Sequence, residues 1–260
     1  MPDPDVPTAA TVHGFRIKPT GTHLSRTIMV SDFRTALSSR TGYSTPSQYR
    51  AAIVGHNLLG KSTTTGARMT FDRLCELYAF DPELRIFRAL ADMWDSDPGA
   101  QPQLALLCAT ARDPILRAVT PFVLERPVGE TVAPQRIAEE ADRQFPGKFR
   151  PSSLQRLGRN VASSWTQAGL LEGRQKKTRI RADTRPVAVA YALLLGDLCG
   201  SRGHGLFSTL WARMLDAPAH ELRRHAEKAS REGWIDYRAA GDVTEVTFRR
   251  LMREEAEVSS

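Results

Sequence analysis

The chain has 260 residues, of which 41% are hydrophobic and 25% are charged, so it is long enough and apolar enough to bury a core. No apolar run approaches the roughly 20 residues that a transmembrane helix needs. The first residues lack the basic start and apolar block of a secretory signal. The composition therefore predicts a folded cytoplasmic protein with no membrane partner.

Metal chemistry is not expected from the cysteines and histidines. The three cysteines lie far apart, without metal-ligand spacing, and are predicted to be small buried residues of a protein in a reducing compartment: Cys75, Cys108 and Cys199. The six histidines show none of the spacings of a zinc site. We therefore expect neither a metal nor another cofactor.

Positive charge is concentrated in one part of the chain. The chain carries 36 lysines and arginines against 29 acids, a net charge of +7. Residues 146–185 contain ten basic and two acidic residues, a net charge of +8, which leaves the rest of the chain at −1. A basic block on a nearly neutral background indicates a local site for a polyanion, and the alternative is a solvated charged surface.

The first half of the chain is predicted to be a mobile tail followed by a helical domain. Residues 1–21 hold four prolines, two glycines and few large apolar residues, as a disordered tail does. Residues 22–128 are interpreted as an N-terminal helical domain, because apolar residues recur there at helical spacing. Helices are expected at 25–37, 62–78, 81–94, 103–112 and 113–124, with a short helix or strand at 47–54. Helix-start signals are expected at Ser62 or Thr63, and at Asp81 and Asp113, each of which precedes a proline.

Residues 129–185 follow the order of a winged helix-turn-helix. A helix from 131 or 133 to 141 is followed by a turn at 145–149 and a second helix at 150–168, apolar on one side and polar or basic on the other. The basic segment RQKKTRIR then alternates as an exposed strand would, which predicts a two-stranded ribbon. In such modules the second helix enters the DNA major groove and the ribbon contacts phosphates.

This interpretation assigns the DNA-binding residues. They come from the turn, the second helix and the ribbon: Lys148, Arg150, Ser152, Ser153, Gln155, Arg156, Arg159, Asn160, Arg174, Lys176, Lys177, Arg179 and Arg181. Gln155 and Asn160 can pair with adenine edges, whereas the ribbon residues are expected to contact phosphates without reading sequence. Secondary candidates lie on other predicted helices: Arg68, Arg73, Arg224, Lys228 and Arg231.

Residues 186–252 are interpreted as a C-terminal helical domain with a second wing. The helix at 187–199 is strongly apolar, and we expect it in the core and not in a membrane. Helices at 206–214 and 216–233 follow, and Ala240-Gly241-Asp242 between two alternating segments predicts a hairpin. Residues 253–260 are expected to form a second tail.

Residues 55–62 match the pattern GxxxxGK[ST] of a phosphate-binding loop. In that reading Lys61 would reach the terminal phosphates of a nucleotide and Ser62 would hold magnesium. Such a loop requires a buried strand before it, and the preceding residues do not show one clearly. The alternative is a polar turn with Lys61 at the surface.

Several short motifs resemble the BrxA family of bacteriophage exclusion (BREX) defence systems. They are the turn Asn57-Leu58-Leu59-Gly60-Lys61-Ser62 before a long helix containing Arg68 and Arg73, the triplet Glu76-Leu77-Tyr78, the run at 104–109, and Ser163-Ser164-Trp165-Thr166. The resemblance implies an all-helical, winged-helix DNA-binding accessory protein without enzymatic activity. It carries over no catalytic residues, and it implies that the phosphate-loop match is a coincidence.

Together these observations predict a mainly α protein, a helical bundle with winged helix-turn-helix modules and short β-hairpin wings. The expected function is non-enzymatic binding of double-stranded DNA in a phage-defence system, with other proteins of that system as partners. One alternative is an RNA-binding, antitermination-like or scaffold subunit, and a second is a P-loop NTPase that uses residues 55–62. The basic block favours the first reading over the last.

Overall fold

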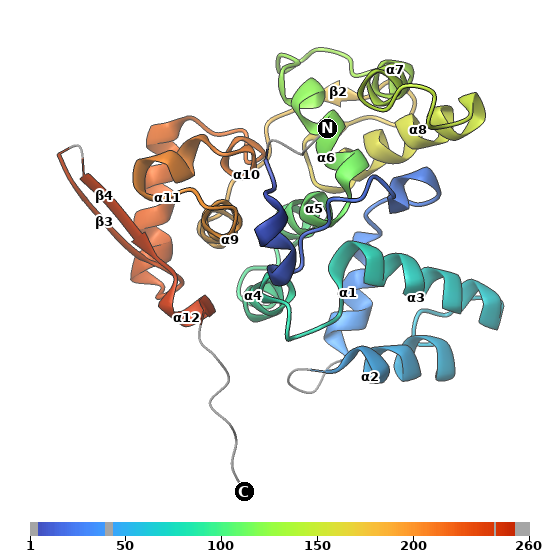
Figure 1. Cartoon of the computed structure of the whole chain (residues 1–260), viewed down its shortest axis with the longest axis horizontal. Helices are drawn as coiled ribbons and strands as arrows, with labels where there is room; N and C mark the ends of the chain where they lie inside the picture. Colours follow the sequence, from blue (N-terminus) through green and yellow to red (C-terminus); the bar gives the residue numbers. More distant parts are fainter. Residues whose placement is uncertain (1–4, 40–43, 242, 253–260) are drawn as a thin grey trace, which may run out of the picture.

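The computed structural model describes residues 5–39, 44–241 and 243–252. Within these ranges the chain is mainly helical with two small antiparallel hairpins, as predicted (Figure 1). The first half forms the 3₁₀ segments η1 (Thr8–His13) and η2 (Thr22–Leu24), the helices α1 (Val30–Ser38), α2 (Pro46–Arg50), α3 (Thr64–Tyr78), α4 (Arg85–Trp94), α5 (Gln101–Arg112) and α6 (Pro114–Leu124), and the π-helical turn η3 (Ala51–Gly55). The second half forms α7 (Pro134–Gln144), α8 (Pro151–Gln167), β1 (Leu171–Glu172), β2 (Thr178–Arg179), α9 (Pro186–Leu198), the 3₁₀ segment η4 (Gly203–Ser208), α10 (Leu210–Arg213), α11 (Ala219–Arg231), β3 (Asp236–Ala240), β4 (Val243–Thr247) and α12 (Arg249–Met252).

Helix α5 lies at the centre of the molecule, and α3, α4, α6 and α9 pack around it (Figure 1). Every residue of α5 except Pro102 is buried, because leucine, alanine and other small side chains occur on all sides of the helix. Helix α9 is likewise buried along nearly its whole length, so the prediction that this apolar helix belongs to the core is confirmed. The buried residues form one continuous hydrophobic core.

The N-terminal segment is part of this core. Val6, Ala10 and Phe15 are buried, and the ring of Phe15 contacts that of Trp211 with the centroids 5.6 Å apart. The backbone N–H of Arg16 donates to the carbonyl of Ala111 in α5. The prediction of a mobile tail is therefore wrong for residues 5–21, because three apolar side chains among the prolines are enough to anchor the segment. Residues 1–4 and the predicted C-terminal tail at 253–260 lie outside the described residues.

The helix-start signals were predictive at two of three positions. Thr63 caps α3 by accepting from the N–H of Gly66, and Asp113 caps α6 by accepting from the N–H groups of Ile115 and Leu116. Asp81 instead accepts from the N–H of Glu83 in a turn, and α4 begins only at Arg85. A side-chain bond two residues ahead is the pattern of a turn, which competes with a helix start at aspartate.

Helices α6, α7 and α8 pack in sequence and lead into the hairpin β1–β2. Before α7, Gly129 and Val132 donate from their N–H groups to residues 179 and 177, and Thr131 forms a bridge with Thr178. This short segment therefore lies beside β2 as a third, extended piece of chain. The order is helix, extended segment, helix, helix and hairpin.

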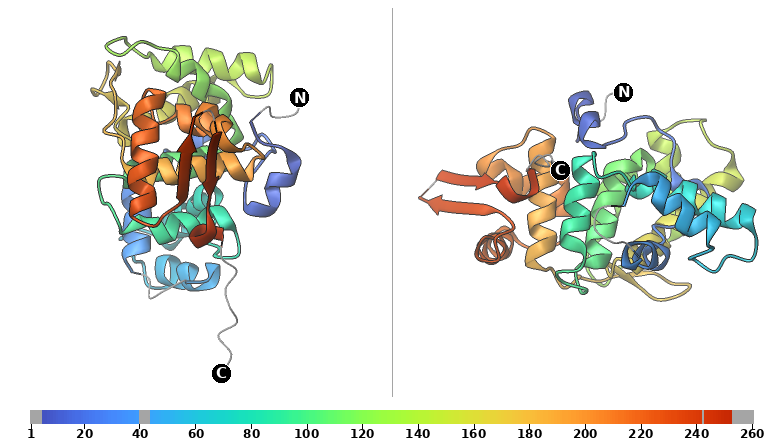
Figure 2. Two further views of the ribbon diagram at one scale, coloured as in Figure 1. Left: turned by 90° about the vertical axis from the view of Figure 1, so that its left-hand side faces the viewer. Right: turned by 90° about the horizontal axis from the view of Figure 1, so that it is seen from below.

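The last quarter of the chain repeats part of this order. Helix α9 packs against α10 and α11, and α11 leads into the hairpin β3–β4, which projects from the body (Figure 2). The hairpin register pairs Asp236 with Thr247 and Ala240 with Val243, as the predicted turn near Gly241 requires. Among the described residues, no helix is both long and apolar enough to cross a membrane.

Candidate nucleic-acid interface

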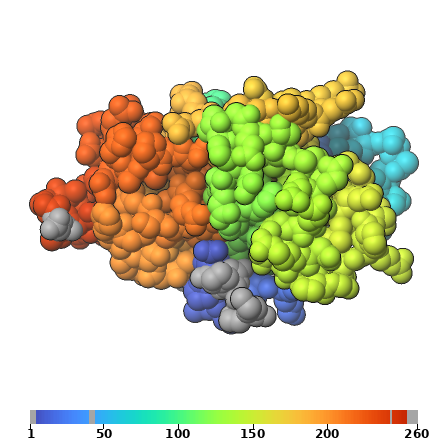
Figure 3. All heavy atoms as spheres, turned by 90° about the horizontal axis from the view of Figure 1, so that it is seen from above, coloured from blue at the N-terminus to red at the C-terminus, as the bar shows by residue number. Residues whose placement is uncertain are grey.

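A groove of about 720 Å³ lies between α8, the hairpin β1–β2 and the start of α7. Residues from all three elements line it: Pro134, Gln135, Gln155, Arg159, Ala162, Ser163, Arg174, Gln175, Lys177. Three of these residues are basic, and none of the described residues that line the groove is acidic. In the space-filling view from above, the hairpin segment runs beside the surface of α7 and α8 (Figure 3).

The outward face of α8 is set by its buried face. Leu157, Val161 and Trp165 are fully buried against the core. The opposite side is therefore directed to solvent, and Gln155, Arg156 and Arg159 are exposed there together with Ser152, as predicted. Ser153 is half-buried.

A close approach between α7 and α8 fixes this face relative to α7. A Cβ atom added at Gly158 would lie 2.1 Å from the carbonyl oxygen of Pro134, which is far inside van der Waals contact. Only glycine permits the two helices to lie this close. Gly158 was not singled out by its sequence, because nothing local marks a glycine inside a helix as a contact point.

The tip of the first hairpin is a tight turn that directs basic residues outward. Gly173 has a φ of +93°, and an added Cβ would meet the carbonyl oxygen of Lys176 at 2.1 Å. The Lys177 ammonium donates to the carbonyl of Gly173 at 2.7 Å, so this lysine stabilises the turn. Arg174 and Lys176 are exposed, as is Arg181 beyond β2.

Two of the predicted DNA-contacting residues are engaged inside the protein. Arg179 is fully buried, lies 2.9 Å from the carboxylate of Asp216, and donates to the carbonyl oxygens of Leu170 and Ile180. The alternating pattern of the ribbon predicts that Arg179 is exposed. In the structure its side chain instead lies on the buried face of the hairpin, where it contacts Asp216. The side chain of Asn160 donates to the backbone carbonyl of His23 at 2.9 Å. The burial of Arg179 removes it from the DNA-contacting surface, whereas Asn160 is half-buried and has one amide N–H engaged by the core.

The turn between α7 and α8 carries the last two primary candidates. Lys148 is exposed and its ammonium lies 5.8 and 5.9 Å from the ring centroids of Phe145 and Phe149. Arg150 is exposed at the N-terminal boundary of α8. These positions place both cations at the end of the same helix that carries Arg156 and Arg159.

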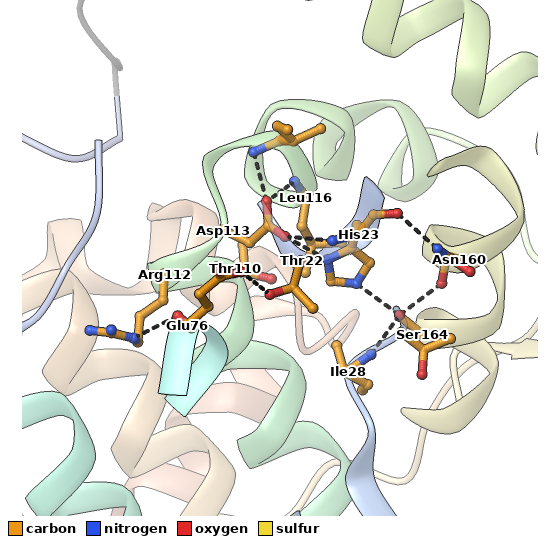
Figure 4. Close-up of polar contacts among 12 residues, drawn as sticks. Thr22, His23, Ile28, Glu76, Thr110, Arg112, Asp113, Leu116, Asn160 and Ser164 are labelled. Carbon is orange, nitrogen blue, oxygen red and sulfur yellow. Dashed lines mark hydrogen bonds and ion pairs between the residues drawn. The ribbon is translucent and has the colours of Figure 1, made fainter. Parts of the chain in front are cut away.

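A buried polar network fastens α8 to the core (Figure 4). Asp113 Oδ2 lies 2.7 Å from His23 Nδ1, and His23 Nε2 lies 2.8 Å from Ser164 Oγ on α8. Ser164 Oγ also accepts from the N–H of Ile28 and donates to the carbonyl of Asn160. The His23 ring thus bonds Asp113 through Nδ1 and Ser164 through Nε2. The arrangement is a buried hydrogen-bond network that joins η2, α6 and α8.

The same three residue types form the catalytic triad of many hydrolases, but here they are sealed. The side chains of His23, Asp113 and Ser164 are 0%, 1% and 0% exposed. A substrate carbonyl therefore has no approach to Ser164 Oγ in this conformation. The network positions a helix, and sequence reasoning missed it except for the capping role of Asp113.

The secondary candidates fall into two groups. Arg73 pairs with Glu76 at 2.7 Å, and Arg68 is exposed on α3. Arg224, Lys228 and Arg231 are exposed on α11, beside the second hairpin. Arg68 and Arg73 therefore lie on α3, which packs against α5. The other three lie on α11, which contacts β3 of the second hairpin.

The segment that matches a phosphate-binding loop has a different structure. Residues 51–55 form the π-helical turn η3 where the loop requires a strand. The side chain of Asn57 bonds both the N–H and the carbonyl of Lys61, and the Lys61 ammonium lies 2.9 Å from Asp32. This geometry differs from that of a nucleotide-binding loop, since the lysine and the backbone are used by the turn itself.

Comparison with known proteins found no matching family model and no match among curated proteins.

Proposed function

We propose that α6, α7, α8 and the hairpin β1–β2 form a winged helix-turn-helix that binds double-stranded DNA. The observation that supports this most directly is the groove between α8 and the hairpin, which Arg159, Arg174 and Lys177 line without an opposing carboxylate among its described lining residues. Exposed Arg156, on α8, and Lys176, at the hairpin tip, extend the same positive surface. A polyanion is the ligand that such a surface attracts.

The elements around the groove suit duplex DNA better than RNA. A helix of the width of α8 enters the major groove of B-form DNA, where Gln155 would reach base edges and the hairpin the adjacent phosphates. The major groove of an RNA duplex is too narrow and deep for side chains to read. The order of elements also matches that of winged modules.

Binding measurements with four nucleic acids test this proposal. Duplex DNA, duplex RNA and the two corresponding single strands, all of one sequence, are titrated at several salt concentrations. We expect duplex DNA to bind most tightly, with an affinity that falls steeply with salt. Equal affinity for all four ligands, or a preference for RNA, would contradict the proposal.

We further propose that the protein serves as a non-enzymatic accessory in a bacterial phage-defence system. This part rests on the sequence resemblance to the BrxA family and on the basic groove. Its test is a phage-plating assay in a host that carries such a system. Replacing Arg156 and Arg159 by alanine is expected to restore plaque formation, and unchanged protection would count against this role.

A further inference from the structure

The C-terminal part of the chain contains a second groove with the same construction as the first. Helix α11 leads into β3–β4 as α8 leads into β1–β2, and a groove of about 380 Å³ lies between α11, the hairpin and η4. Its lining residues come from these three elements: His204, Arg223, Tyr237, Ala239, Gly241, Thr244. The second groove therefore has the same position relative to α11 and β3–β4 as the first groove has relative to α8 and β1–β2.

The side chains in this groove are hydrogen-bond donors that suit a phosphate. Arg223 forms no ion pair with a carboxylate within the described chain, and its guanidinium lies 3.3 Å from both ring nitrogens of His204. Burial raises the pKa of Tyr237, which outweighs the opposite effect of Arg223, so its phenol is a neutral donor at physiological pH. A guanidinium and a phenol together can donate hydrogen bonds to an anionic oxygen.

Two acids on the described strands of the second hairpin, Asp236 and Glu245, lie beside basic residues. Asp236 lies 3.5 Å from Arg249 and accepts from the hydroxyl of Thr247. Glu245 lies directly opposite Arg238 in the strand register. The negative charge of these two residues is therefore offset locally, and neither forms an ion pair with Arg223.

The outer face of α11 extends this positive surface. Arg224, Lys228 and Arg231 are exposed at spacings of four and three, which place them on one face of the helix, with Glu227 as the acid between them. In both views of Figure 2, α11 and the segment of residues 170–185 lie toward the same side of the molecule. One rigid duplex can therefore approach both.

We propose that this second groove, with the outer face of α11, binds the phosphate backbone of the same duplex that occupies the first groove. The inference rests on the proposed DNA-binding function. It implies that a duplex of about one helical turn, roughly 10 bp, fills the first groove alone, whereas about three turns reach both.

The test compares duplexes of one turn and three turns across a salt series. The variant Arg223→Gln/Lys228→Ala removes two charges from the second groove and α11. Its matched control, Lys18→Ala/Arg50→Ala, removes two exposed charges from residues that line neither groove. On three turns, we expect the first variant to lower the slope of log affinity against log salt by about 1.8, which is about 0.9 for each lost contact. On the one-turn duplex, the first variant should have the same slope as the wild type. The control variant should have the same slope as the wild type on both duplexes.

Two failures can be told apart with Arg156→Ala/Arg159→Ala in the first groove. If that variant weakens binding while Arg223→Gln/Lys228→Ala changes neither duplex, the second site is refuted and the proposed function stands. If neither variant changes binding, the proposed function falls as well. Equal loss on one and three turns would also overturn the inference, because it would place both grooves on the same single turn of DNA.

Discussion

Asp113→Asn removes one charge from the centre of the buried network that holds α8. In the native protein, Oδ2 lies 2.7 Å from His23 Nδ1 and 3.2 Å from the His23 backbone nitrogen, while Oδ1 accepts from Ile115 and Leu116. Asparagine keeps the helix cap through its carbonyl oxygen. Its amide NH₂, however, faces two N–H groups of His23. Breaking one side of a buried ion pair lowers the free energy of unfolding by about 3–5 kcal/mol. We expect a value near the lower end, about 3 kcal/mol, because a neutral imidazole can accept at Nδ1.

Urea denaturation at pH 7, followed by circular dichroism, measures this loss. The matched control is Asp32→Asn, which breaks the ion pair with Lys61 at 2.9 Å, where the two side chains are 26% and 28% exposed. Solvent screens that pair, so the control should lose less than about 1 kcal/mol. Similar losses in both variants would refute the claim that the buried contact between His23 and Asp113 is important for stability.

The pH dependence of the free energy of unfolding provides a second test of the role of Asp113. Burial by itself raises the pKa of Asp113, but His23 and the backbone N–H groups lower it, and the net pKa lies below its ordinary value. The stability that the ionised carboxylate contributes is therefore complete above the unfolded pKa of about 3.9 and is lost as the pH falls through the folded pKa. The difference in stability between the wild type and Asp113→Asn should shrink on acidification below about pH 4. A difference that stays constant would contradict the assignment.

Three further outcomes follow from the structure. Gly158→Ala forces α7 away from α8 at Pro134 and should lower the free energy of unfolding by about 1–3 kcal/mol, which urea denaturation measures; a neutral effect would contradict the close contact. Lys61→Ala and the wild type should both melt at the same temperature with and without ATP–magnesium, and an ATP-dependent rise confined to the wild type would restore the nucleotide site. Selection from random duplexes should give no strong motif, because Asn160 is occupied by His23 and leaves Gln155 as the one amide of the predicted base-reading pair; an enriched motif that Gln155→Ala abolishes would overturn this.

Local patterns were enough to predict much of the fold. The positions of the helices follow from apolar spacing, and the cap at Asp113 and the turn near Gly241 follow from residue preferences within a few positions. The exposed face of α8 was predictable for the same reason, since Leu157 and Trp165 define the opposite side. These features depend on neighbours along the chain.

The features that were missed depend on residues far apart in the chain. His23 contacts residues 90 and 141 positions away, so no local pattern indicates its role. Arg179 alternates with its neighbours as an exposed strand residue would, and only Asp216, brought close by the fold, explains its burial. The N-terminal segment was assigned to a tail from its prolines, although its anchors Val6 and Phe15 need a surface that only the folded chain supplies.

The salt dependence of duplex DNA binding by Arg156→Ala/Arg159→Ala tests the central claim most directly. Both arginines are exposed on α8, so the double variant should fold as the wild type does. If each contacts one phosphate, the slope of log affinity against log salt should fall by about 1.8 in magnitude, and affinity at low salt should drop with it. An unchanged slope and affinity in a folded variant would show that α8 does not face DNA and would contradict the account.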